Sequence, residues 1–172
     1  MDERFFIKDG LLIKYNGPGG KVVIPADVAF IETLAFADRY DVTEITIPNS
    51  VTDIGSRAFY RCIKLPSVSI PSTVKTISLS TFYGCTGLKR AIIGDGVENI
   101  ESGAFYGCTG LTEITIPASI KRIKWDAFMG CTGLTSINYQ GTKAQWSAAK
   151  EPFWFYRIRC TVHCTDGDIE VA

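Results

Sequence analysis

The sequence predicts a β-rich solenoid in which short repeats stack along one axis, with a β-hairpin closing each end. The first observation is an aromatic position that recurs every 23 residues without insertion: Phe36, Phe59, Phe82, Phe105 and Phe128. The second is a proline that recurs at the same interval, with a glycine in the fourth copy: Pro25, Pro48, Pro71, Gly94 and Pro117. A fixed period of this length is the signature of repeats that bury one continuous core by stacking.

The clearest copy of the repeat runs from Leu111 to Cys131, with the sequence LTEITIPASIKRIKWDAFMGC. Ile114 and Ile116 alternate with polar residues, which is the period of a half-buried strand. Pro117 ends that strand because it cannot donate to a ladder. The following IKRI run predicts a second, shorter extended segment. The Ala-Phe-x-x-Cys run after it predicts a single helical or 3₁₀ turn with a glycine at its exit.

An N-terminal capping hairpin is predicted over residues 1–21. Its two strands flank Asp9 and Gly10, a dipeptide suited to a tight turn with positive φ. The repeat array then covers residues 22–139, about five 23-residue repeats, and the first is the most degenerate because Arg39 stands at the cysteine position. Terminal repeats commonly deviate. A lid is needed here because the first rung would otherwise expose an unpaired strand edge.

A C-terminal cap is predicted over residues 140–172, where the repeat pattern fails. Thr142 is suited to cap a short amphipathic helix that carries Trp146. The aromatic cluster at 152–156 is expected to fold over the open end of the stack. The RCTVHC and DIEV runs then predict a closing hairpin with an Asp-Gly turn at 166–167.

Four of the six cysteines fall at the repeat interval, namely Cys62, Cys85, Cys108 and Cys131. We interpret them as small buried fillers of the core. Rungs stack closely enough for neighbouring cysteines to be bridged, but side chains in register point in parallel, which disfavours the torsion of a disulfide.

The other two cysteines, Cys160 and Cys164, lie close to His163, the one histidine of the chain. This grouping suggests a metal ligand or a base for a nucleophilic cysteine. In a strand, however, the two cysteines lie roughly 13 Å apart on one face while the histidine points the other way. We therefore interpret His163 as an edge-strand residue of the capping hairpin.

Acidic residues alternate along the same hairpin at Asp166, Asp168 and Glu170. They suggest calcium, but the calcium loops known for this chemistry carry more oxygen ligands. We expect a turn with solvated carboxylates. The sequence predicts no catalytic residue, no cofactor and no metal.

Composition narrows the classes of partner. Eighteen Lys and Arg residues balance eighteen Asp and Glu residues, so no net field favours nucleic acid or an anionic membrane. No apolar stretch approaches the roughly 20 residues that span a bilayer. The acidic start MDERFF does not have the pattern of a signal peptide. The chain is expected to be soluble, as a cytoplasmic protein or as the mature part of an exported one.

The candidate binding face is formed by the outward positions of the long strands. They are Glu44, Thr46, Ser67, Ser69, Arg90, Ile92, Glu113, Thr115, Ser136 and Asn138. Arg90 and Glu113 occupy equivalent positions on adjacent rungs, which predicts an ion pair worth about 0.2 to 1 kcal/mol. The flat face measures roughly 300 Å², against about 800 Å² per partner in a standard interface. Tight binding therefore needs the rims, including Trp125, or several modules in tandem.

The repeat LTEITIPASIKRIKWDAFMGCTGL, with CTGL recurring at Cys85, Cys108 and Cys131, resembles the 23-residue leucine-rich repeat of the BspA-like family of bacterial surface antigens. The segments GPGGKVVIP, YQGTKAQW and VHCTDGDI are similar to flanks in that family. The resemblance implies a right-handed leucine-rich-repeat solenoid with a parallel sheet on one face. It also implies a cell-surface or secreted location, adhesion to host extracellular proteins and no catalytic motif.

Three functions stay open at this point. The first is a noncatalytic interaction or adhesion module that binds protein or glycan through the sheet face and rims. The second is a structural spacer in a larger surface or secreted protein. The third, a remote alternative, is an enzyme that uses Cys160, His163 or Cys164.

Overall fold

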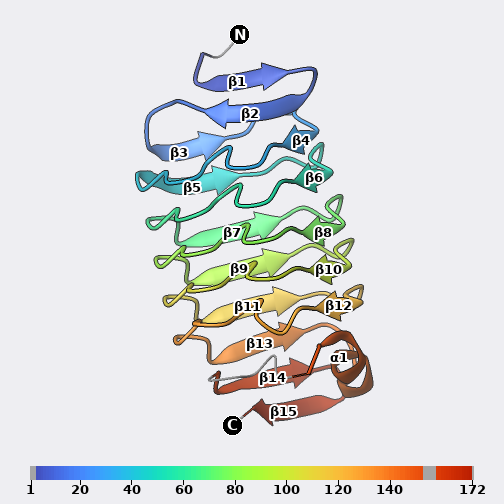
Figure 1. The fold of residues 1–172 in the computed structure, drawn as a ribbon. Coiled ribbons are helices and arrows are strands. Elements are labelled where there is room, and N and C mark those ends of the chain that lie inside the picture. The colour runs from blue at the N-terminus through green and yellow to red at the C-terminus, as the bar shows by residue number, and fades with distance from the viewer. Residues whose placement is uncertain (1–2, 153–157, 172) are drawn as a thin grey trace.

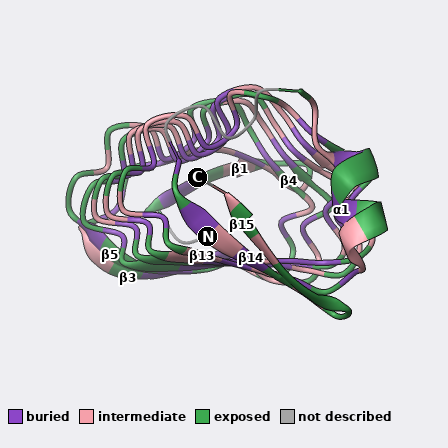
Figure 2. Ribbon diagram, turned by 90° about the horizontal axis from the view of Figure 1, so that it is seen from below, coloured by how far each residue is buried: buried purple, intermediate pink, exposed green. Residues whose placement is uncertain are grey.

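The chain folds into an elongated stack of similar rungs, described here from a computed structural model over residues 3–152 and 158–171 (Figure 1). A regular rung holds one long strand and one two-residue strand, joined by turns. Viewed along the stack, the long strands lie on one face and the stacked turns on the opposite face (Figure 2). The predicted β-rich solenoid is confirmed.

The long strands of successive rungs are β3 (Gly20–Val23), β5 (Val42–Thr46), β7 (Ser67–Ile70), β9 (Arg90–Ile93), β11 (Glu113–Ile116) and β13 (Ser136–Tyr139). The two-residue strands are β4 (Phe30–Ile31), β6 (Asp53–Ile54), β8 (Thr76–Ile77), β10 (Asn99–Ile100) and β12 (Arg122–Ile123). Pairing between rungs is parallel, in the register that the 23-residue period predicts. Equivalent side chains therefore stack along the axis.

Hydrogen bonding along the long strands is interrupted between β5 and β7. One sheet holds β3 and β5, and a six-stranded sheet begins at β7. Where β7 meets β9, the N–H of Lys89 donates to the carbonyl of Pro66 at 2.8 Å. Pro66 itself has no N–H with which to repeat that bond to the preceding rung. The long strands thus form two sheets on one face, where one parallel sheet was expected.

The predicted aromatic spine is confirmed. Phe36, Phe59, Phe82, Phe105 and Phe128 stack in sequence order, with neighbouring ring centroids 5.1, 5.2, 5.3 and 5.4 Å apart. All five side chains are buried. Tyr15 of the N-terminal hairpin continues the column, 5.2 Å from Phe36. The cap is therefore part of the same core.

The repeat cysteines are buried, as predicted, and also make hydrogen bonds that the sequence did not reveal. Each thiol donates to the carbonyl of a phenylalanine 26 residues earlier, at 3.0 to 3.3 Å. Burial raises the pKa of the Cys62 and Cys108 thiols. Hydrogen bonds from the four thiols therefore tie successive rungs together.

The turn of each rung alternates two kinds of backbone hydrogen bond. The N–H of Tyr106 donates to Gly103 within its own turn, whereas the N–H groups of Phe105 and Gly107 donate to carbonyls of the next rung. The bonds within the turn have the i→i−3 spacing of a 3₁₀ turn. A continuous helix does not form because every second donor serves the neighbouring rung.

The exit of each turn uses the left-handed region of φ, as expected for its glycines. Gly84, Gly107 and Gly130 have φ of 69°, 69° and 78°. In the first two rungs the same position holds Asp38 and Arg61, with φ of 60° and 54°. A residue with a side chain is strained there by about 1 kcal/mol.

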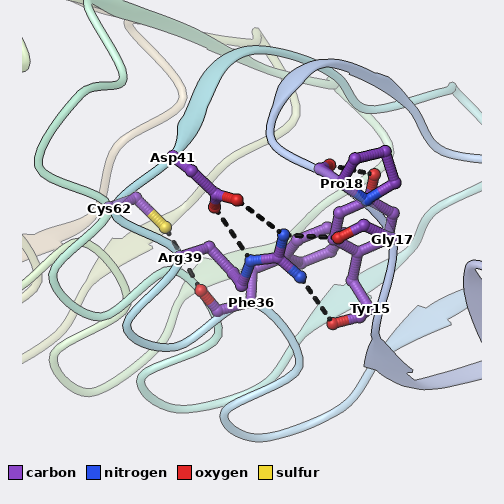
Figure 3. A network of polar contacts seen from close by, with 7 residues as sticks. All are labelled: Tyr15, Gly17, Pro18, Phe36, Arg39, Asp41 and Cys62. Atoms are coloured by element: carbon purple, nitrogen blue, oxygen red, sulfur yellow. Dashed lines mark hydrogen bonds and ion pairs between the residues drawn. The ribbon is translucent and has the colours of Figure 1, made fainter.

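The N-terminal cap is the predicted hairpin of β1 (Phe5–Lys8) and β2 (Leu11–Tyr15). Its turn residues Asp9 and Gly10 have φ of 50° and 75°, both positive as a two-residue hairpin turn requires. Arg39, the outlier of repeat one, reaches from the first rung to this hairpin (Figure 3).

The C-terminal cap begins with helix α1 (Lys143–Ala149), which lies beside the stack (Figure 2). Thr142 caps it in a reciprocal arrangement with Gln145, and Trp146 is buried 5.2 Å from the ring of Tyr139. Strands β14 (Cys160–Cys164) and β15 (Gly167–Val171) then form the predicted hairpin. The expected placement of the aromatic cluster at 152–156 lies largely outside the described residues.

Candidate binding surface

The sheet face consists of the outward side chains of the long strands, and the structure places all ten predicted residues there. Six are exposed and four are half-buried. One column runs Ser67, Arg90, Glu113 and Ser136, and a second runs Ser69, Ile92, Thr115 and Asn138. Glu44 and Thr46 occupy the same positions on β5.

The sheet face extends further than predicted at both ends. At the N-terminal end, Lys21 and Val23 of β3 pair in register with Glu44 and Thr46. At the other end, Thr161 and His163 of β14 continue the two columns beside Ser136 and Asn138. These residues escaped prediction because β3 and β14 lie outside the regular part of the repeat. A faint signal existed in the alternation of KVV and CTVHC.

The predicted ion pair between Arg90 and Glu113 is present, with Nη2 and Oε1 3.7 Å apart. The same carboxylate oxygen accepts a hydrogen bond from Asn138 Nδ2 at 2.6 Å. Lys21 and Glu44 form a second pair across neighbouring strands at 2.7 Å. These pairs are solvated and hold side chains in place more than they stabilise the fold.

Apolar positions interrupt the polar columns at Ile92 and Val23. Their side chains are 41% and 54% exposed. Ile92 stands between Ser69 and Thr115 on the adjacent strands, so its side chain lies among small polar neighbours. An exposed aliphatic group in such surroundings is able to enter a pocket on a partner without displacing its neighbours.

His163 points away from the core and pairs with Asp168, with Nδ1 and Oδ1 3.0 Å apart. Its strand, β14, lies between β13 and β15. The interpretation as an edge-strand residue was therefore wrong, because the antiparallel strand β15 supplies the edge. The hairpin assignment itself is correct.

The Cys160 thiol is buried in the core, on the opposite side of β14 from His163. Burial raises the pKa of Cys160 to about 11 and also raises that of Cys164. A nucleophilic cysteine needs a lowered pKa and a base within hydrogen-bonding reach. The arrangement of these three residues provides neither.

The three acidic residues of the hairpin have separate partners. Asp166 accepts from the N–H of Lys143 at 2.8 Å, at the start of α1. Asp168 pairs with His163, and Glu170 accepts from Thr161 at 3.1 Å. Within residues 3–152 and 158–171, no group of three or more His, Cys, Asp or Glu side chains is placed to hold a metal ion.

One further column, made of tyrosines, lies on the turn face and was not predicted from the sequence. Tyr60, Tyr83 and Tyr106 stack with ring centroids 5.3 and 4.8 Å apart. Each follows the spine phenylalanine of its rung, so the signal was an aromatic at the next position of three consecutive copies.

Among the described residues, none belongs to a helix long and apolar enough to cross a membrane.

Comparison with protein families finds a match to the BspA type leucine rich repeat region, in 6 copies over residues 20–148. Among solved structures, a leucine rich cell surface protein from Faecalibacterium prausnitzii A2-165 is 37% identical, with a TM-score of 0.79. That match covers 81% of this chain and 38% of the other, so the chain spans less than half of its relative's length. No curated protein sequence matches the chain.

Two more distant structures share the fold. The leucine rich repeat protein of T. pallidum is 23% identical, with a TM-score of 0.63 and coverage of 74% of this chain and 72% of the other. A leucine-rich repeat protein from Eubacterium ventriosum is also 23% identical, with a TM-score of 0.59 and coverage of 94% and 51%. Because the family model matches residues 20–148 and the rungs repeat every 23 residues, this chain belongs to the BspA type leucine-rich-repeat family.

Proposed function

We propose that the chain is a noncatalytic protein-binding module that engages its partner through the sheet face. The observation that carries the proposal is the pair of in-register columns with Ile92 in the middle of them. Residues on solenoid strands are held rigidly, so binding there orders few side chains. Arg90 is already oriented by Glu113, which supports a preformed site.

The chemistry of the sheet face favours a polar protein surface with one apolar pocket. Short hydroxyl side chains at Ser67, Ser69 and Thr115 leave room around Ile92. Arg90 and Glu113 offer charges of both signs beside it, which suits a partner with complementary charges rather than a uniformly charged polymer. The added rungs at β3 and β14 enlarge the face towards the size of an ordinary interface.

We also propose a surface or secreted setting with a host extracellular protein as the partner. The support is the F. prausnitzii relative, which is described as a cell surface protein. The match covers 38% of that relative, and we propose that this chain acts as one module among others in such a setting. Tandem modules raise affinity without any new contact.

The test is binding to a panel of immobilised extracellular matrix proteins, measured by surface plasmon resonance. The variant Arg90→Glu/Ile92→Asp alters the centre of the sheet face, and Arg122→Glu/Leu79→Asp is the matched control away from it. We expect the first variant to lose at least about tenfold in affinity and the control to bind as the wild type does.

If both variants bound as tightly as the wild type, the sheet face would not be the binding site. An absence of binding to every panel member by the wild type would favour a structural spacer. Circular dichroism and melting of each variant establish that a loss reflects the surface and not the fold.

A further inference from the structure

A cavity of about 450 Å³ is lined by residues of the turns, away from the sheet face. Six residues from the first three rungs line it: Leu34, Asp38, Arg57, Tyr60, Ser80 and Tyr83. Its volume is within the range of small-molecule sites, about 300 to 1,000 Å³. The stacked rings of Tyr60 and Tyr83, 5.3 Å apart, give it a rigid wall.

The backbone around the cavity departs from local preference. Leu34, Asp38, Arg57 and Ser80 all have left-handed φ, at 61°, 60°, 56° and 54°. In the next rung, the position equivalent to Leu34, Arg57 and Ser80 is occupied by Gly103, at φ 61°. Glycine is the residue suited to this conformation. Side chains at these positions store local backbone strain, and such strain is concentrated at functional sites in proteins.

The polar groups around the cavity have unused hydrogen-bonding capacity. Within residues 3–152 and 158–171, the Arg57 guanidinium has no ion pair, and the hydroxyl groups of Tyr60, Ser80 and Tyr83 have no hydrogen bond. The Ser80 side chain is only 8% exposed. The cavity is therefore lined by residues that carry one guanidinium and three hydroxyl groups without a partner among the described residues.

Two charged residues line the cavity, Asp38 and Arg57, and their charges are opposite. Asp38 accepts a hydrogen bond from Tyr40 at 2.7 Å and pairs with Arg61 at 3.7 Å. The Asp38 carboxylate therefore has partners of its own, whereas Arg57 has no ion pair within residues 3–152 and 158–171. A guanidinium binds a carboxylate through two parallel hydrogen bonds. Leu34, 42% exposed, adds an apolar surface at the edge.

We propose that this cavity binds a single acidic sugar residue, with its carboxylate on Arg57 and its hydroxyl groups on Tyr60, Ser80 and Tyr83. A ligand with one carboxylate, several hydroxyl groups and a small apolar side complements these groups one by one. An acidic amino-acid side chain would fill only part of the space and leave the three hydroxyl groups unmatched. The proposal concerns a different face from the sheet and is independent of it.

The test is NMR titration of the ¹⁵N-labelled full chain with N-acetylneuraminic acid and with glucuronic acid. We expect saturable shifts in amides near residues 34–38, 57–61 and 80–83 for at least one of them. Glucose, which has no carboxylate, should bind at least about tenfold more weakly, as loss of a charge-assisted hydrogen bond implies. N-acetyl-glutamate amide tests the acidic side chain as an alternative ligand.

Arg57→Gly is the decisive variant because it removes the charge and relieves the left-handed backbone together. We expect a higher melting temperature and loss of acidic-sugar binding, whereas the control Arg122→Gln on a different face leaves binding intact. Tyr83→Phe keeps the ring stack and should weaken binding severalfold. Unchanged binding by Arg57→Gly, equal binding of glucose or of the glutamate derivative, or no shifts with either acid would overturn the proposal.

Discussion

The guanidinium of Arg39 lies 4.8 Å from the ring centroid of Tyr15 and joins the first rung to the N-terminal hairpin (Figure 3). It also donates to the carbonyls of Tyr15 and Gly17 and pairs with Asp41 at 3.1 Å. Its hydrogen bond lowers the pKa of the Asp41 carboxyl. The cysteine position of repeat one has thus become an attachment point for the cap.

Replacement of Arg39 by Cys, the residue of later repeats, should weaken the cap. We expect the free energy of unfolding to fall by about 2 kcal/mol, because hydrogen bonds to a charged group are lost. Hydrogen exchange should become faster in β1 and β2 and stay unchanged in β9 and β11. Arg39→Lys should not restore protection, because an ammonium group lacks the planar fork. Uniform protection across all rungs in the Cys variant would contradict this role.

Phe105→Ala tests the aromatic spine. The ring lies 5.3 Å from that of Phe82 and 5.4 Å from that of Phe128, and it is fully buried. We expect a loss of about 3 to 5 kcal/mol, because a cavity opens in the middle of the column. Urea unfolding followed by circular dichroism measures it. Tyr106→Ala, on the half-buried outer column, should cost clearly less, and an equal cost would argue against the spine as the core.

The period alone predicted most of the architecture. Side chains one period apart were expected to stack, and Phe59, Phe82 and Phe105 do so in order. The hairpin turn at Asp9 and Gly10 was equally readable, because few residues tolerate two consecutive positive φ values. These features depend on local rules that each residue satisfies by itself.

Other features depend on where the neighbouring rung places its backbone. Predicting the interruption of the sheet at Pro66 would have required knowledge of which backbone N–H groups face β5. The thiol bonds, such as Cys108 to the carbonyl of Phe82, follow from a carbonyl position that no side-chain pattern encodes. The cavity was not predicted because Arg57 has the sequence context of an ordinary surface residue, and its positive φ is known only from the structure. Its alignment with Gly103 was the available clue.

Arg61→Gly should stabilise the fold. Arg61 has φ 54° at the position where Gly84 and Gly107 stand in the later rungs. Relief of the left-handed side chain is expected to add about 1 kcal/mol, less the small contribution of its exposed ion pair with Asp38. Thermal unfolding measures the change. Gly107→Ala is the reverse test and should lose a similar amount, because its added Cβ would meet only the Gly84 backbone at an ordinary contact distance of 3.9 Å and the strain lies in the backbone itself.

The buried thiols predict how stability depends on alkaline pH. Burial raises the pKa of Cys160 to about 11 from an ordinary value near 9 and raises that of Cys108 as well. Between those values the unfolded chain has released protons that the folded chain still holds. The free energy of unfolding therefore falls as pH rises above about 9, and below that pH these thiols contribute no slope.

Urea unfolding between pH 7 and 11, with a reducing agent present, measures this slope. The free energy of unfolding of Cys160→Ala should fall less steeply with pH than that of the wild type between about pH 9 and 11. In the variant, the folded and unfolded states no longer differ by the proton of this thiol. Thr161→Ala, at the adjacent half-buried position on the outer side of β14, is the control and should keep the wild-type slope. Equal slopes for Cys160→Ala and the wild type would show that this thiol titrates alike in the folded and unfolded chains, and would contradict the prediction.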